Sequence, residues 1–264
     1  MKIAALQLST LPMSSSKLDY YLRICKAKDV KLLLLNEYAL NSFFKELEVT
    51  PNLMIQEQSK HKTSALKELS AKYDIYIIAP IVHVKGKYIY KSTAKFTPKS
   101  VVYYNQQFLI NYKHWNEEKF FDNEIGEFNL PSFSIGGVKF GIINGFELHF
   151  DTVFSQVMKK KVDVLLCPSV STFDSSERWI ELLKMRAFTN SVYILRANRT
   201  GVYKDQNREW KFYGHSNLIS PWGDEELTLG SHEEILIVEI FKDELHAARK
   251  SWSWKSALSK RGIL

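Results

Sequence analysis

The fold is decided by the stretch from Lys139 to Asp151, which reads KFGIINGFELHFD. In it an apolar strand meets a sharp turn at Asn144-Gly145 and then the start of a helix. Such a strand–turn–helix elbow is one way to hold a nucleophile above the edge of a sheet. Here the tip, Gly145, has no side chain, and glycine also suits a plain tight turn because it tolerates strained dihedrals. The stretch therefore predicts a site at a sheet edge and leaves the role of Gly145 open.

On both sides of this elbow, short aliphatic runs alternate with longer amphipathic segments. Apolar runs of four to eight residues predict buried strands, and apolar residues at helical spacing predict helices. Strand–helix–strand alternation with several hairpins indicates mixed sheets with helices outside. We expect strands at Lys2–Leu8, Lys31–Leu35, Ile75–Val82, Tyr88–Phe96, Val101–Ile110, Val162–Leu166, Val192–Ala197, Ser216–Ser220 and Ile235–Phe241, a hairpin at Phe133–Ile143, and helices at Leu18–Lys28, Thr63–Tyr73, Asp151–Lys160 and Ser176–Asn190.

The composition is that of an ordinary globular protein and excludes several functions. No apolar run approaches the roughly 18 residues of a membrane-spanning helix, and the N-terminus lacks a hydrophobic stretch of signal-peptide length. The net charge of +7 comes from scattered lysines. The one tight run, Lys159-Lys160-Lys161, lies at an expected helix end, where cations complement the helix dipole. We therefore expect neither nucleic acid nor a membrane as partner.

The two cysteines, Cys25 and Cys167, lie far apart and lack metal-ligand spacing. Cys25 falls on the apolar face of a helix, and Cys167 stands in a strand end that we expect to point into the core. We interpret both as buried structural residues. A reducing, cytoplasmic environment without metal or other cofactor is the simplest expectation.

A carboxylate and a lysine stand where chemistry is expected. Glu37 directly follows the buried strand that ends at Leu35, and α/β proteins place their sites at the carboxyl edge of a sheet. Burial there raises the pKa of a carboxyl and suits it to general-base work. Lys113 lies beside Tyr112 and Trp115, where a fixed positive charge can stabilise an oxyanion. A solvated loop glutamate and a surface lysine are the alternatives.

Together these segments resemble the nitrilase (carbon–nitrogen hydrolase) superfamily. Glu37, Lys113 and the Gly145 elbow match the order and spacing of its Glu–Lys–Cys triad, with glycine at the cysteine position. Asn36 replaces the usual proline, and Thr189 a common glutamate. The resemblance covers essentially residues 2 to 250. Its further matches are Gly141 to Asp151 with G-x-x-x-C-[YF]-[DE], Val162 to Ser169 with the strand ending in Pro-Ser, Trp179 to Gly201 with W…R-A-x-x-N…Y…N-R-x-G, and Tyr213 to Gly223 with G-x-S…P-x-G.

The resemblance implies an α/β fold, a four-layer α-β-β-α sandwich in which two mixed sheets are flanked by helices. Residues 1–250 would form this carbon–nitrogen hydrolase-like domain, and residues 251–264 a C-terminal arm. The arm carries Trp252 and Trp254, which free tails rarely do. We therefore expect it to pack on another surface, in the interface of a homodimer or higher homo-oligomer.

The resemblance also implies a chemistry. In the family a Cys thiolate attacks the carbon of a nitrile or amide, Glu acts as base, and Lys stabilises the tetrahedral oxyanion. The expected ligand is thus a small amide or nitrile. The backbone N–H after the nucleophile, here that of Phe146, assists. Glu118 or Glu117 matches a further glutamate that orients the site, and Glu147 of the elbow is a supporting residue.

Two questions stay open at this point. Anchoring the family pattern Y-R-K-x-H-L on Tyr112 places His114 at the lysine position; we prefer Lys113 because histidine is mostly neutral at neutral pH. Without a thiol at Gly145 no thioester forms. Three hypotheses follow: a residual hydrolase in which Glu37 activates water, a pseudoenzyme that binds an amide, nitrile or carboxylate, or a structural or regulatory dimer. Hydroxyls near the expected site that would act as surrogate nucleophiles are those of Ser169, Ser171 and Thr172.

Overall fold

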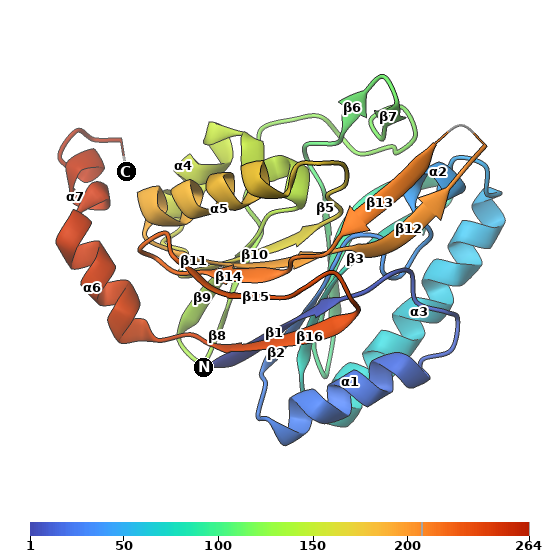
Figure 1. The fold of residues 1–264 in the computed structure, drawn as a ribbon, viewed down its shortest axis with the longest axis horizontal. Helices are drawn as coiled ribbons and strands as arrows, with labels where there is room; N and C mark the ends of the chain where they lie inside the picture. Colours follow the sequence, from blue (N-terminus) through green and yellow to red (C-terminus); the bar gives the residue numbers. More distant parts are fainter. Residues whose placement is uncertain (207, 264) are drawn as a thin grey trace.

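Two six-stranded sheets form the centre of the molecule in the computed structural model, which describes residues 1–206 and 208–263 (Figure 1). The first sheet has the order β16-β1-β2-β3-β4-β5 and the second β15-β14-β11-β10-β9-β8. The strands of the first are β16 (Glu234–Glu239), β1 (Lys2–Gln7), β2 (Leu32–Leu35), β3 (Tyr76–Lys85), β4 (Tyr88–Phe96) and β5 (Val101–Asn105), and those of the second β15 (Glu225–Thr228), β14 (Asn217–Ile219), β11 (Tyr193–Asn198), β10 (Val164–Ser169), β9 (Val138–Ile142) and β8 (Ser132–Ile135).

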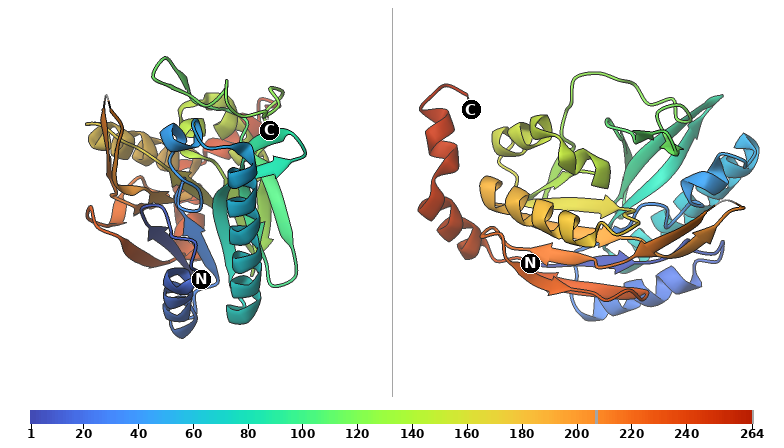
Figure 2. Two further views of the ribbon diagram at one scale, coloured as in Figure 1. Left: turned by 90° about the vertical axis from the view of Figure 1, so that its right-hand side faces the viewer. Right: turned by 45° about the horizontal axis from the view of Figure 1, so that its top comes forward.

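Helices cover the outer face of each sheet, so the expected four-layer α-β-β-α sandwich is confirmed (Figure 2). One apolar cluster lies between α1 and α3 and the first sheet, a second between the sheets, and a third between the second sheet and α4 and α5. The helices are α1 (Ser16–Ala27), α2 (Phe44–Leu47), α3 (Asn52–Tyr73), α4 (Asp151–Lys159), α5 (Ser176–Asn190), α6 (Lys242–Trp252) and α7 (Trp254–Ser259), with a 3₁₀ turn η1 (Gly145–His149).

The central strands are parallel and buried on both faces. β1, β2 and β3 pair in parallel, as do β9, β10 and β11. All four leucines of β2 are fully buried, as a continuous aliphatic run predicts for such a strand. Because the carboxyl ends of β2 and β9 lie at one end of the sandwich, the segments that follow them meet there. Two short hairpins border this end, β6 (Asn111–Tyr112) with β7 (Trp115–Asn116), and β12 (Thr200–Lys204) with β13 (Glu209–Tyr213).

Two expected elements differ from the structure by five residues or more at one end. The strand expected at Val101–Ile110 ends at Asn105, because the chain leaves the sheet there. The helix expected at Thr63–Tyr73 begins eleven residues earlier, at Asn52. The hairpin at Gly136-Gly137 is present, with φ of +53° and +75° at the two glycines. Among the described residues, no helix is long and apolar enough to cross a membrane.

The helical segment formed by α6 and α7, which includes the expected C-terminal arm of residues 251–264, projects from the sandwich (Figure 1). Arg249 holds it to the body through an ion pair to Asp163 at 2.8 Å and a hydrogen bond to the Val162 carbonyl. Trp252 and Trp254 stack on one another and contact the ring of Phe188. The arm's place in a dimer interface stays a prediction, and Leu264 lies outside the described residues.

Candidate functional site

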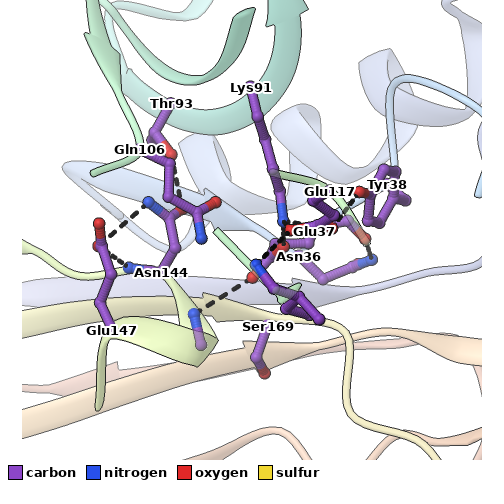
Figure 3. A network of polar contacts seen from close by, with 12 residues as sticks. Asn36, Glu37, Tyr38, Lys91, Thr93, Gln106, Glu117, Asn144, Glu147 and Ser169 are labelled. Carbon is purple, nitrogen blue, oxygen red and sulfur yellow. Dashed lines mark hydrogen bonds and ion pairs between the residues drawn. The ribbon is translucent and has the colours of Figure 1, made fainter. Parts of the chain in front are cut away.

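Glu37 lies at the centre of a buried polar network at the carboxyl end of β2 (Figure 3). Only 2% of the surface of Glu37 is exposed to solvent. One carboxyl oxygen, Oε1, accepts the backbone N–H of Gly145 at 3.2 Å, and the other, Oε2, lies 2.6 Å from Lys91 Nζ. Burial raises the pKa of Glu37, although the Lys91 ammonium opposes this rise. Glu37 thus has the setting expected of a general base.

The cation of the site is Lys91, on the middle of β4. Its Nζ lies 2.8 Å from both carboxyl oxygens of Glu117 as well as beside Glu37. Burial alone would lower the pKa of Lys91, but the two carboxylates raise it above its ordinary value. The ammonium therefore stays charged at neutral pH, in contact with the candidate base.

Glu117 fixes the position of this ammonium. It is fully buried and accepts hydrogen bonds from the Tyr38 hydroxyl, from Trp115 Nε1 at 3.1 Å and from the Ile110 backbone N–H. These donors hold its carboxylate in one orientation, and that carboxylate in turn holds Lys91. Of the two glutamates that the sequence offered for this role, Glu117 contacts the lysine, whereas Glu118 is exposed.

The elbow after β9 is built as a capped 3₁₀ turn. Asn144 precedes it, and Glu147 accepts the Asn144 N–H through Oε2 at 2.8 Å and the Gln107 N–H through Oε1 at 2.9 Å. Thr93 on β4 donates its hydroxyl to the Asn144 side chain. Burial raises the pKa of Glu147. Glu147 therefore supports the turn and its connection to the loop after β5.

Gly145 is required by space and not by backbone conformation. It is absent from the glycines with positive φ, so an L side chain is compatible with its dihedrals. A Cβ added there would lie 2.9 Å from Ser169 Cβ, 3.3 Å from Ser169 Cα and 3.4 Å from Glu37 Oε1. Ser169 on β10 thus occupies the room that a side chain at position 145 would need.

A cavity of about 410 Å³ opens over Glu37 and Gly145. Most of the cavity's exposed surface is apolar. Such a surface partly excludes water and so strengthens the electrostatic interactions of the Glu37 carboxylate. The remaining lining residues are Ile110, Tyr112, Trp115, Phe146, His149, Val170, Ser171, Thr172, Phe173, Ser175, Arg178, Trp179 and Leu182.

The structure brings Glu37, Gly145 and Phe146 together at this cavity but does not bring Lys113 to it. Lys113 is exposed in the turn between β6 and β7 and makes no ion pair with Glu37. His114, the alternative, is also exposed and packs beside Tyr112. The physical reason is that β5 ends early, so the segment containing Lys113 forms a separate surface hairpin instead of continuing the sheet.

Sequence reasoning missed Lys91, although a signal for it existed. In the expected strand Tyr88–Phe96, alternation places Lys91 on the same face as Ile89 and Thr93, and that face is buried. Tyr104 and Leu109 match the two ends of the pattern Y-R-K-x-H-L, which puts Gln106 at the lysine position. Gln106 is buried and donates its backbone N–H to the Lys91 carbonyl at 2.9 Å. The lysine of this site thus comes from the strand beside the one the pattern indicates.

Of the hydroxyls considered from the sequence as surrogate nucleophiles, Ser171 lines the cavity and its Oγ accepts a hydrogen bond from Arg196 Nη2 at 2.7 Å, whereas the other two donate to fixed partners. Ser169 Oγ donates to Asn198 Oδ1 at 2.8 Å, and Thr172 Oγ1 donates to the Lys211 carbonyl at 2.6 Å. Cys25 and Cys167 are fully buried in apolar clusters. Burial raises the pKa of each thiol to about 12. No group of three or more His, Cys, Asp or Glu side chains suited to a metal ion occurs among the described residues.

The fold and the Glu–Lys–Glu site define a class of protein, and the family comparison agrees with it. Residues 2–250 match the carbon-nitrogen hydrolase family model, and the chain belongs to this family. It resembles the omega-amidase of Danio rerio, with 25% identity over 67% of this chain and 65% of that protein, and the 2-oxoglutaramate amidase of Bacillus subtilis, with 23% identity over 75% and 74%. A deaminated glutathione amidase of Dictyostelium discoideum is 30% identical, but over 43% of this chain and 38% of its own length.

Solved structures show the same fold. A carbon-nitrogen hydrolase from Helicobacter pylori G27 superposes with a TM-score of 0.83 at 19% identity, covering 96% of this chain and 94% of that one. A mutant amidase from Nesterenkonia sp. AN1, described with acrylamide added to its active site cysteine, superposes with a TM-score of 0.77 at 19% identity and covers 96% and 98%. Because the family model matches residues 2–250, the recognition of the nitrilase superfamily from sequence is confirmed.

Proposed function

We propose that this chain hydrolyses the carbon–nitrogen bond of a small amide by direct attack of water, without a covalent intermediate on residue 145. One observation carries the proposal: Glu37 and Gly145 line the same cavity, and Gly145 places no side chain beside the Glu37 carboxylate there. The amide substrate class is supported by the amidases among the relatives.

The reaction uses Glu37, the Lys91 ammonium that lies 2.6 Å from it, and a backbone N–H of the elbow. Glu37 removes a proton from a water molecule as the water oxygen bonds to the amide carbon, and the electron pair of the C=O bond moves to oxygen. The Lys91 ammonium stabilises that oxyanion, assisted by the backbone N–H of Phe146. When the oxyanion collapses, the C–N bond breaks and Glu37 returns its proton to the leaving nitrogen. A carboxylic acid and ammonia or an amine result.

A buried charge cluster of this kind supports a functional site. Bringing Glu37, Lys91 and Glu117 out of water carries a desolvation cost of several kcal/mol per ion, and well-packed apolar residues are often as stable in such places. Strongly shifted pKa values in a cleft are a common mark of sites that act on ligands.

A second function, binding of the amide without turnover, is favoured by one contact. Ser169 fills the room for a side chain at Gly145, so the thioester route used by cysteine-containing relatives is closed. Covalent catalysis contributes much of the rate in such enzymes. A protein that keeps the cavity and its charges but not the nucleophile retains what binding requires.

Ammonia release from a panel of small primary amides, followed by intact-mass spectrometry, tests the proposal. We expect release by the unmodified chain, no mass increase on the protein, and loss of at least 100-fold of the rate in Glu37→Gln, because the base is removed. Lys113→Met is the matched control and keeps the full rate. An acyl adduct, or a Glu37→Gln variant as fast as the parent, contradicts direct hydrolysis. Amide-dependent thermal stabilisation without any ammonia establishes the binding function instead.

A further inference from the structure

A second cavity, which we call the arm cavity, lies between the helical segment of α6 and α7 and the body of the sandwich. It measures about 550 Å³ and is lined on one side by the carboxyl ends of α4 and α5 and on the other by α6 and α7. Sites for small molecules commonly measure about 300–1,000 Å³. The arm cavity shares no lining residue with the cavity over Glu37, so the proposed reaction gives it no role.

The arm cavity carries an excess of positive charge. Three of its lining residues are cations: Lys161 after α4, Arg249 on α6 and Lys255 on α7. The guanidinium of Arg249 is compensated, because it pairs with Asp163 at 2.8 Å. Neither lysine forms an ion pair with a carboxylate of the described residues, and within that part of the chain no Asp or Glu lines the cavity. Two ammonium groups therefore face it without an anion.

The structure around the end of α4 does not by itself account for these two lysines. A cation at the carboxyl end of a helix complements the helix dipole, but Lys159 in the last turn of α4 already supplies one. Lys161 has a φ of +55°, and glycine is the usual residue in this conformation after a helix. Lys255 comes from another helix, and its pKa is lowered by burial and by the nearby charges of Lys161 and Arg249. The fold thus brings like charges together where an anion would relieve their repulsion.

Most of the exposed surface of the arm cavity is apolar. Val157 and Met158 of α4 contribute to it, and Trp254 of α7 lines it as well. Trp254 stacks on Trp252 and contacts the ring of Phe188 edge to face, so its indole is held in place. Its Nε1 is buried and has no acceptor among the described residues, so the contact between arm and body leaves a polar group unsatisfied here. A ligand that complements this surface needs an apolar body and an anionic head.

We infer that the arm cavity binds a small amphipathic anion, a carboxylate carried on an apolar body. The carboxylate lies between the ammonium groups of Lys161 and Lys255, and the apolar part packs against Met158 and Trp254. Since Lys161 belongs to the body and Lys255 to the arm, the bound anion also connects the two. The inference does not depend on the proposed amide hydrolysis, because the two cavities are lined by different residues.

NMR titration of the full chain, labelled with ¹⁵N at its tryptophans, with octanoate and with octan-1-ol tests the inference. The indole signal of Trp254, assigned through Trp254→Phe, reports on the arm cavity. We expect octanoate to shift this signal and to bind at least 10-fold more tightly than octan-1-ol, which has the same chain length but no charge. Lys161→Met combined with Lys255→Met should weaken octanoate binding at least 10-fold and leave octan-1-ol within about twofold. Lys159→Met combined with Lys260→Met is the matched control: it removes the same charge from exposed lysines outside the cavity and should leave octanoate binding within about twofold.

Octanoate that leaves the Trp254 signal unchanged, or that binds no more tightly than octan-1-ol, overturns the inference. Equal weakening in the two double variants shows that octanoate responds only to net charge and overturns it as well. Loss of octanoate binding in Glu37→Gln assigns the anion to the other cavity, with the same consequence. If octanoate does not bind and Lys161→Met with Lys255→Met dissociates a dimer in sedimentation velocity, a second copy of the chain occupies the arm cavity and the inference is wrong. Ammonia release is not part of any of these outcomes, so the proposed function and this inference fail separately.

Discussion

Substitution of Gly145 by alanine provides the sharpest test of how this site is packed. At a position with ordinary dihedrals, Gly→Ala stabilises a protein by about 0.4–1 kcal/mol because the unfolded chain loses freedom. Here the new Cβ would lie 2.9 Å from Ser169 Cβ and 3.3 Å from Ser169 Cα. Both atoms are fixed to the backbone of β10 and cannot rotate away. Overpacking of this kind costs about 1–3 kcal/mol, so we expect Gly145→Ala to destabilise.

A double-mutant cycle with Ser169→Gly isolates this contact. Ser169→Gly removes the clashing Cβ, but it destabilises by itself, because a strand glycine costs about 0.5–1 kcal/mol and the hydroxyl contacts with Arg196 and Asn198 are lost. The double variant should be more stable than the sum of the single effects by about 1–3 kcal/mol. Urea unfolding at constant m-value measures each free energy of unfolding. Additivity within about 0.5 kcal/mol, or a stabilising Gly145→Ala, refutes the steric reading.

The same cycle made with cysteine extends the test to chemistry. Gly145→Cys alone should fold poorly and react slowly with acrylamide, whereas Gly145→Cys with Ser169→Gly should present a thiol to Glu37. We expect intact-mass spectrometry to show faster single acrylamide addition in the double variant. Equal rates in both variants contradict the idea that Ser169 closes this position.

Three further predictions concern the buried charges, the thiols and the arm. Lys91→Met should lower the free energy of unfolding by about 3–5 kcal/mol, since it leaves two buried carboxylates without a cation, whereas exposed Lys113→Met should change it by no more than about 0.5 kcal/mol in the same urea titration. The pKa values of Cys25 and Cys167 are raised to about 12. The two thiols therefore stabilise the folded state below the unfolded-state pKa, and this stabilisation is lost as the pH rises towards 12. Native protein should not react with iodoacetamide at pH 8, and two alkylations should appear only after denaturation. Arg249→Met should speed amide hydrogen exchange in α6 but not in α5, because it removes the contacts that tie the arm to the body.

The sequence predicts the layers well because each depends on local pattern. The leucines of β2 form a continuous apolar run, which a strand buried on both faces requires. The elbow was recognisable because Asn144, Gly145 and Glu147 are neighbours in the chain, and their capping contacts are local. Glu37 was found for the same reason, since it follows its strand directly.

Strand alternation places Lys91 on a buried face, but it does not identify the partners of the lysine, because these are distant in the chain. Lys91 pairs with Glu117, 26 residues later, and with Glu37, 54 residues earlier. Nothing around Lys91 in the chain indicates that its charge will be compensated, and an inward-facing lysine without partners would contradict the strand itself. Lys113, in contrast, stands beside aromatic residues in a run that reads as a strand but folds as an exposed hairpin. The steric conflict between Ser169 and a side chain at position 145 also cannot be predicted from the sequence, because it depends on the distance between β10 and the turn at Gly145.

The placement of charged groups at and near the cavity over Glu37 is not explained by protein stability alone. Glu37, which lines the cavity, shares the single ammonium of Lys91 with the fully buried Glu117, and Nη1 of Arg196 has no hydrogen-bond partner among the described residues. Each arrangement is unfavourable without a ligand, since apolar side chains would fill the same volumes with less desolvation. The absence of a nucleophile at Gly145 therefore removes one step of the family's chemistry but leaves the buried pair of the Glu37 carboxylate and the Lys91 ammonium in place.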